Sequence, residues 1–594
     1  MNRVLILLSL TALSACQPGP EPPSDEVRVP LVYRQALSEA PLGFDPLKSG
    51  TAYSAAVISN VYDTLYRYRW LAEPHQIVPN LAAALPEVSA DGLTVRIRLK
   101  PGVYFQDDSA FPNGRGRQVL AADVVYSLKR HFVPSNHSEG AWLWSDALVG
   151  VADWVAAGAD MNTELPGLHA PGPDLVEFKL LKPYPQLPYT LAQGYAAIVP
   201  VEAVAHYGAD LARHTVGSGP FKLVKFDGAL AVLERNGQFR REPINLAAEG
   251  FDPVRHHGYG LEKLDKRIGP LVDRVELHFL SDSATSMMAI ERESLDFTSI
   301  NSLGLQRFVA PFDAQKDKAA LRPEFAQNFR LGSAQELGSV FISFNMQDPE
   351  LGASQNPALD IKHRKLRCAI RAAYDWNERN DKIYQGTAFA FSGVIPPNVP
   401  GFEARLLGSQ SDLTQAKSLL AEAGYRANEL PVLRYGAQSS LEQRRIFELF
   451  RAQLLAIGYP ADKLQWQSFP SFGAYIEAVN RSEVMLMEMG WQLDYPDAQN
   501  VLQLYYGPFS APQVNNANYQ NAVFDQRYEA SLAARSEAER IALYAQMNQQ
   551  LIDDCVAISG LSRMSYFLWR KELVTFPTNA QMAGVAWRFL EVLP

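Results

Sequence analysis

The stretch 485–496 reads MLMEMGWQLDYP, an apolar run that ends in Gly490 and Trp491 and is followed by a single carboxylate, Asp494, with Tyr495 beside it. A short apolar run that a turn residue closes is typical of a buried strand. In open α/β sheets, ligands bind outside the carboxyl ends of the strands. We therefore predict that this strand end lies in a cleft between two lobes and that Asp494 meets a ligand there.

Length and composition indicate a globular protein of several packed units. The chain has 594 residues, which is more than one hydrophobic core usually supports, so two or three units are expected. Apolar residues make up 47% of the chain and charged residues 20%, which is ordinary for a globular protein. The formal charge of −9 argues against nucleic acid or an anionic membrane surface as the main partner, because both attract basic patches.

The amino-terminal residues predict export and a lipid anchor. Residues 1–16 combine a weakly basic start, a short apolar run and small residues, as a secretory signal does, and the run is too short to span a bilayer. The sequence LSAC at 13–16 resembles the lipobox of bacterial lipoproteins, in which Cys16 would carry the lipid. The alternative is an ordinary signal peptide with a chance cysteine. Residues 17–26 are rich in proline and predict a flexible tether.

Hydrophobic periodicity predicts helices that alternate with strands in the rest of the chain. Apolar and polar residues alternate over 93–99, as in a half-buried strand, and turn dipeptides on both sides place this strand in a hairpin over 85–108. A first strand is predicted over 29–33. Helical spacing is found at 53–66, 120–132, 412–423 and 446–454. Helices that alternate with short apolar runs imply an α/β sheet.

Several motifs follow one another in a familiar order. They are NVYDTLYRY (60–68), DGLTVRIRLKPGVYF (91–105), VGSGPFKL (216–223), VFISFNMQDP (340–349), HRKLRCAIRAAYD (363–375) and GWQLDYPDAQN (490–500). Each motif is weak alone. Together, between about residues 30 and 560, they resemble bacterial extracellular solute-binding proteins of family 5, the oligopeptide- and dipeptide-binding proteins of ABC importers.

The resemblance implies a two-lobed, periplasmic-binding-protein-like α/β fold of class II type, with an extra inserted subdomain and a hinge between the lobes. Lobe I would comprise 27–59, 196–301 and 556–594, the inserted subdomain 60–195, and lobe II 302–555. Chain crossings near Asn301 and Cys555 would then form the hinge. The stretch 237–270 is longer than we expect for the family, and we interpret it as a polar surface loop because its adjacent His256 and His257 cannot easily face one metal.

The resemblance also suggests what the opening stretch binds. In peptide-binding members of the family, the aspartate of the GWxxDY stretch pairs with the amino-terminal amine of the ligand, and Gly490, Trp491, Asp494 and Tyr495 match that stretch. A desolvated ammonium is costly unless a carboxylate meets it, and Trp491 would supply a flat apolar wall. The alternative is that Asp494 caps a turn, since DYPD is rich in turn-forming residues.

Glu488 bears on the kind of ligand. Some oligopeptide binders have an arginine at this position, which suits a ligand carboxylate, whereas this chain has an acid. By strand alternation Glu488 shares a face with Gly490. It therefore either lines the cleft, which would favour a cationic or multi-amine ligand, or faces away from it. We expect a longer or modified peptide rather than a free dipeptide.

The leading hypothesis is a monomeric, lipid-anchored periplasmic receptor that binds a peptide-like solute and delivers it to an ABC permease and its ATPase. The family also contains binders of nickel chelates, haem, oligosaccharides and opines, as well as sensors. We find no nucleophile elbow, phosphate-binding loop, CxxC pair or dinucleotide motif, so we expect no catalysis, cofactor or metal. An envelope hydrolase is the alternative from another class. Cys368 and Cys555 are expected to be buried thiols rather than a disulfide, because they lie far apart in the chain.

Overall fold

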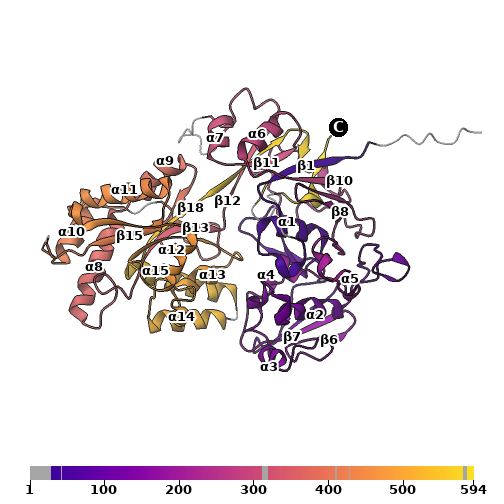
Figure 1. The fold of residues 1–594 in the computed structure, drawn as a ribbon, viewed down its shortest axis with the longest axis horizontal. Coiled ribbons are helices and arrows are strands. Elements are labelled where there is room, and N and C mark those ends of the chain that lie inside the picture. Colours follow the sequence, from indigo (N-terminus) through magenta and orange to yellow (C-terminus); the bar gives the residue numbers. More distant parts are fainter. Residues whose placement is uncertain are drawn as a thin grey trace, which may run out of the picture.

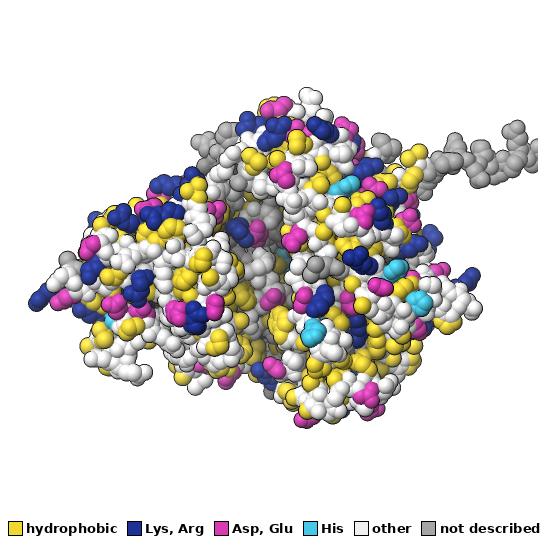
Figure 2. All heavy atoms as spheres, in the orientation of Figure 1, with side chains coloured by type: hydrophobic (Ala, Val, Ile, Leu, Met, Phe, Trp, Pro, Cys, Tyr) yellow, Lys and Arg dark blue, Asp and Glu magenta, His cyan; other side chains and the backbone are white. Residues whose placement is uncertain are grey.

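The computed structural model describes residues 29–593, with gaps at 42, 311–318, 409–410, 427, 535 and 579–584. The chain forms two α/β lobes that are joined at one end (Figure 1), and a space-filling view shows the cleft that separates them (Figure 2). The predicted two-lobed fold class is confirmed. The predicted signal peptide, Cys16 and the tether lie outside the described residues. In the described part of the chain, no helix combines the length and apolarity that a bilayer crossing needs.

Lobe I is built on a mixed sheet with the strand order β12-β19-β11-β1-β10-β9-β8. The central strand, β1, pairs in parallel with β10 on one side and with β11 on the other. It begins at Val32, three residues after the start that the sequence predicts. The strands are β1 (Val32–Leu37), β8 (Phe221–Phe226), β9 (Leu230–Arg235), β10 (Arg274–Phe279), β11 (Phe297–Ile300), β12 (Phe329–Gln335) and β19 (Met564–Arg570), and the helices are α1 (Ala52–Val61), α5 (Val201–Tyr207), α6 (Ser283–Glu291) and α7 (Ser302–Phe308).

A second unit, which we call the subdomain, has its own antiparallel sheet in the order β4-β5-β7-β6 and its own core between Leu65 and Val216. Its elements are β2 (Tyr66–Tyr68), β3 (Ile77–Pro79), β4 (Glu87–Val88), β5 (Thr94–Arg98), β6 (Leu168–Gly172), β7 (Leu175–Lys179), α2 (Ala121–Lys129), α3 (Val151–Ala156) and α4 (Leu187–Thr190). Val95 and Ile97 of β5 are buried while the arginines between and after them are exposed. The predicted alternation of this strand is therefore confirmed.

Lobe II contains a six-stranded sheet in the order β14-β18-β13-β17-β15-β16. Its strands are β13 (Gly338–Phe344), β14 (Phe389–Ala390), β15 (Leu433–Gln438), β16 (Leu464–Phe469), β17 (Leu486–Gln492) and β18 (Ala557–Ser562). Its helices are α8 (Pro357–Ala373), α9 (Trp376–Tyr384), α10 (Leu413–Glu422), α11 (Leu441–Ala456), α12 (Phe472–Asn480), α13 (Gln499–Leu502), α14 (Ala522–Leu532) and α15 (Glu537–Asp553). The predicted cap of α10 is confirmed, because the Asp412 carboxylate accepts from the amides of Thr414 and Gln415 at 2.8 and 2.9 Å.

The chain crosses between the lobes at 336–337 and at Arg563, not near Asn301 and Cys555 as expected. β12 belongs to the sheet of lobe I, and the chain turns directly from it into β13 of lobe II. On the return path β18 ends in lobe II and β19 begins in lobe I. The crossings consist of Glu336 with Leu337 and of Arg563, which are too short to give a composition or turn signal in the sequence.

Cys368 and Cys555 form a disulfide with their Cα atoms 5.2 Å apart. The expectation of two separate thiols is therefore wrong. The two residues are separated by 187 positions, but α8, which carries Cys368, packs against β18, which follows Cys555. Distance along the chain was thus a poor guide to distance in space.

The stretch 237–270 is not a polar surface loop, as the sequence suggested, because part of it packs into a buried hydrophobic cluster. It contributes Ile244, Leu246, Leu261 and Leu264 to a hydrophobic cluster with Trp70, Phe576 and Phe589. His256 is fully buried, whereas His257 is exposed. Adjacent histidines therefore face different environments, and the described residues contain no group of three or more metal-binding side chains.

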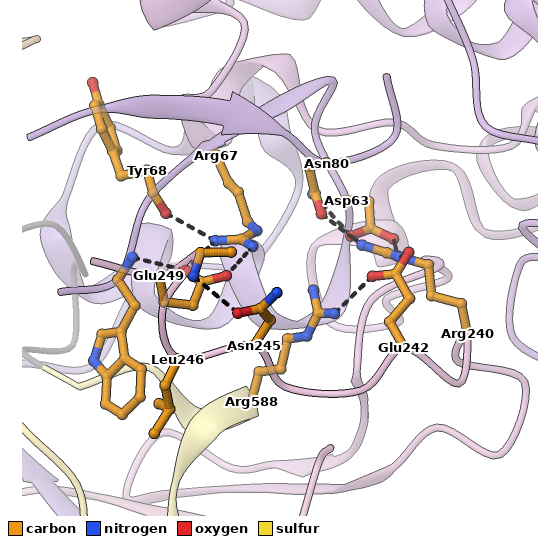
Figure 3. A network of polar contacts seen from close by, with 12 residues as sticks. Asp63, Arg67, Tyr68, Asn80, Arg240, Glu242, Asn245, Leu246, Glu249 and Arg588 are labelled. Atoms are coloured by element: carbon orange, nitrogen blue, oxygen red, sulfur yellow. Dashed lines mark hydrogen bonds and ion pairs between the residues drawn. The ribbon is translucent and has the colours of Figure 1, made fainter. Parts of the chain in front are cut away.

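Charged side chains of this stretch contact the first residues of the subdomain (Figure 3). Glu249 accepts two hydrogen bonds from the Arg67 guanidinium at 2.9 and 2.5 Å and a third from the Trp70 amide at 3.0 Å. Arg240 pairs with the buried Asp63 at 2.6 Å. These contacts join the subdomain to the stretch 237–270.

Candidate ligand-binding site

The site begins where β17 ends. β17 lies between β13 and β15, but β15 pairs with it only at Leu486 and Met487. The following residues, including the exposed Gly490, extend beyond this pairing. The Glu488 backbone oxygen accepts from the Tyr475 hydroxyl at 2.8 Å, so the edge on which another extended chain can add main-chain hydrogen bonds begins after Glu488.

Asn500, at the start of α13, organises the residues that follow β17. Its side-chain oxygen accepts from the Trp491 indole at 2.9 Å and from the Asp494 amide at 3.1 Å. Its side-chain nitrogen donates to the Asp494 carboxylate at 2.9 Å. Asn500 is fully buried. The sequence did not single out this residue, although its place in the quoted motif was a signal.

Lobe I faces this strand end through the subdomain. The Gln193 amide donates to the Asp494 backbone oxygen at 2.8 Å. The ring of Tyr189 stacks on Tyr495 with centroids 6.3 Å apart, and Tyr68 stacks on Tyr189 at 6.5 Å. A row of three tyrosines therefore crosses the cleft beside Asp494. The sequence predicted only its lobe II member, Tyr495.

The Asp494 carboxylate is open to solvent yet surrounded by protein, as expected for the wall of a narrow cleft. This partial desolvation raises its pKa above the ordinary value, and the hydrogen bond from Asn500 opposes the rise. No basic side chain among the described residues contributes to this pKa. After burial, the charge of Asp494 adds to the rise in the pKa values of Tyr68, Tyr184 and Tyr195. The site thus offers a negative charge without a cationic partner, beside phenol groups.

The two aromatic residues of the motif have different surroundings. Tyr495 is buried and donates from its hydroxyl to the Gln499 side chain at 2.6 Å. Trp491 is half-buried and lines a small apolar cavity with Met487 and Met489. Contacts with the protein therefore hold both rings in place, and rigid rings of this kind can form flat walls of a ligand site.

Glu488 does not line the cleft. Its side chain points into lobe II, where Arg379 of α9 forms an ion pair with it at 2.6 Å and Tyr435 of β15 donates a hydrogen bond. Gln443 of α11 donates another at 3.3 Å. Glu488 is 8% exposed and Arg379 is 0% exposed. Of the two alternatives left open for Glu488, the structure shows the one in which it faces away from the cleft, so its place among the predicted ligand-binding residues is corrected.

Comparisons with known proteins agree with this geometry. A family model described as bacterial extracellular solute-binding proteins, family 5 Middle, matches residues 76–513. The dipeptide-binding protein of Escherichia coli strain K12 is 23% identical over 540 residues, which cover 87% of each chain. Heme-binding protein A of Haemophilus influenzae is 24% identical over 526 residues, covering 86% of this chain and 83% of that protein.

Solved structures show the same fold. The unliganded open form of the periplasmic murein tripeptide-binding protein MppA has a TM-score of 0.72 at 17% identity and covers 95% of this chain and 97% of its own. HbpA2 from Haemophilus parasuis has a TM-score of 0.72 at 18% identity and covers 95% and 100%. The resemblance that the motifs suggested is thereby confirmed. The chain belongs to the bacterial extracellular solute-binding proteins of family 5.

Proposed function

We propose that this protein captures a peptide or peptide-like solute by its free amine at Asp494 and delivers it to an ABC importer. The observation that carries the proposal is the uncompensated carboxylate of Asp494 at the inter-lobe cleft. An ammonium leaving water there would gain a charge-assisted bond, and the nearby phenol oxygens could accept its remaining hydrogens.

The backbone beside Asp494 supports a peptide rather than another amine. The edge of β17 beyond Glu488 leads along the chain to Asp494, and strand addition recognises an extended chain whatever its side chains are. Relatives named for dipeptides, glutathione and di- or tripeptides, and a neighbour solved with the peptide STSA, make this ligand class the first to test.

The cellular setting is part of the same proposal. Lipidation at Cys16 would hold the receptor at a membrane, where a permease and its ATPase could receive the solute. The disulfide in lobe II fits an oxidising compartment such as the periplasm. We propose a monomer, because a single cleft between two lobes contains the whole site.

The test compares two forms of one peptide on matched variants by calorimetry. Losing a hydrogen bond to a charged group costs about 1.5–3 kcal/mol, so Asp494→Asn should weaken a free-amine tripeptide roughly tenfold to a hundredfold. The amino-acetylated tripeptide should bind both proteins equally weakly. Asp462→Asn, at an exposed acid of lobe II, is the control and should change neither affinity.

Two results would contradict the proposal. One is an equal loss of affinity for the free and the acetylated tripeptide, which would remove the amine from recognition. The other is no binding of any peptide by protein that is shown to be folded. Mass spectrometry of solute that co-purifies with the protein would then point to another class, such as haem, a nickel chelate, an oligosaccharide or an opine.

A further inference from the structure

A large cavity lies between the subdomain and lobe II, further along the same cleft. Its volume is about 740 Å³. The subdomain contributes the hairpin residue Val88 and the prolines of the loop before α4, including Pro185 and Pro188. Lobe II contributes Ala533 and Ala534 from the connection between α14 and α15. We call this cavity the proline chamber. Figure 1 shows α14 facing the subdomain across the gap, and Figure 2 shows hydrophobic side chains on both walls of the cleft.

Two of the three charged residues at the rim of the proline chamber have partners of their own, and the third, Glu537, is exposed. Arg540 forms an ion pair with Asp497 at 3.3 Å. Asp91 accepts from the Ser89 hydroxyl at 2.5 Å and from the Leu93 amide at 3.0 Å. What the chamber offers to a ligand is therefore chiefly apolar surface from proline, valine and alanine.

The chamber is continuous with the Asp494 site through consecutive residues of the subdomain. Pro188 lines the chamber, and the next residue, Tyr189, stacks on Tyr495 beside Asp494. Tyr184 also lines the chamber, and its hydroxyl donates to the Leu143 backbone oxygen at 3.2 Å. A phenol side chain spans about two residues of extended chain at roughly 3.5 Å each. A ligand anchored at Asp494 would therefore reach the chamber near its third residue.

We propose that the proline chamber binds an apolar segment of the same ligand, so that the preferred solute is a peptide longer than a dipeptide with bulky apolar side chains from about its third residue. The inference rests on the proposed amine recognition at Asp494. A dipeptide would leave the chamber filled with water, whereas leucine side chains would cover its proline faces.

The experiment uses two pentapeptides of equal length, Ala-Ala-Leu-Leu-Ala and Ala-Ala-Ser-Ser-Ala, in calorimetry with the whole protein. Burying about 60 Å² more apolar surface corresponds to roughly a tenfold lower Kd, so the leucine peptide should bind the wild-type protein about tenfold more tightly. Ala533→Trp, which fills the chamber from an exposed position, should abolish this preference, so that the two peptides bind the variant with the same Kd. Ala538→Trp, on an exposed face of α15 outside the chamber, should keep the preference.

Three results would overturn the inference. They are equal affinities of the wild-type protein for the two peptides, a loss of affinity in Ala533→Trp that is equal for both peptides, and no binding of either peptide. The amine proposal is judged separately, by acetylating each peptide. If acetylation changes nothing while the leucine preference and its loss in Ala533→Trp persist, the chamber binds as inferred and the amine proposal fails.

Discussion

The buried ion pair between Glu488 and Arg379 gives Glu488 a structural role in lobe II. Arg379 is fully buried, and its guanidinium also lies over the Trp376 ring at 4.9 Å. A charge in such a place must be paired, because an isolated buried ion costs several kcal/mol. Glu488 therefore serves the interior of lobe II, where it joins β17 to α9 and to Tyr435 of β15.

Replacing Glu488 should accordingly affect stability and not recognition. Glu488→Gln leaves the Arg379 charge buried without its partner, and breaking a buried pair in this way costs about 3–5 kcal/mol of unfolding free energy. Urea denaturation should show this loss, while the fraction that remains folded binds peptide with the wild-type Kd. Glu477→Gln is the matched control, because its pair with Arg481 is exposed and should contribute far less to stability than the buried pair. A changed Kd with unchanged stability would restore Glu488 to the ligand site.

The sequence predicted the position of strand β17 but not the directions in which its side chains point. The apolar run predicted β17 within a few residues of its observed bounds. Which acid faces the cleft depends on Arg379 and Tyr435, which lie 109 and 53 positions away from Glu488. The tyrosines of the subdomain that face Asp494 were missed for the same reason, since no local pattern links them to β17.

At the scale of elements, the disulfide between α8 and the residue before β18 should stabilise lobe II. A bridge that closes a long loop typically contributes about 2–4 kcal/mol, largely by restricting the unfolded chain. The double variant Cys368→Ser with Cys555→Ser should lose about this much in urea denaturation. Its unfolding midpoint should not respond to dithiothreitol, whereas the wild-type midpoint should fall. A wild-type midpoint that is indifferent to reduction would show that the bridge contributes nothing.

Elements with a local signal were predictable, and elements defined by long-range packing were not. The alternation of β5 and the Asp412 cap of α10 follow from neighbouring residues, and both are confirmed. The stretch 237–270 has little regular periodicity, so its buried Glu249 and the cluster around Leu246 could not be recognised without Trp70. The crossing at 336–337 was missed because only two residues separate β12 from β13, so no loop marks the change of sheet.

At the scale of the whole molecule, the two lobes touch across the cleft. The contacts are the hydrogen bond from Gln193 to the Asp494 backbone and the stacking of Tyr189 on Tyr495. An aromatic pair contributes about 0.5–1.5 kcal/mol, which is too little to hold two lobes together permanently. We therefore expect open and closed forms in exchange, with the ligand favouring whichever form it binds better.

Removing one ring from this contact should open the ligand-free protein. Tyr189→Ala loses the stacking energy, which corresponds to a shift of roughly twofold to tenfold in the closure equilibrium. Small-angle scattering should then give a larger radius of gyration for the ligand-free variant than for the wild-type protein. Saturating peptide should restore the compact profile, because ligand binding drives closure in both. Tyr189→Phe keeps the ring and should scatter as the wild-type protein does. Identical ligand-free profiles for the alanine variant and the wild-type protein would show that the tyrosine row does not hold the lobes together.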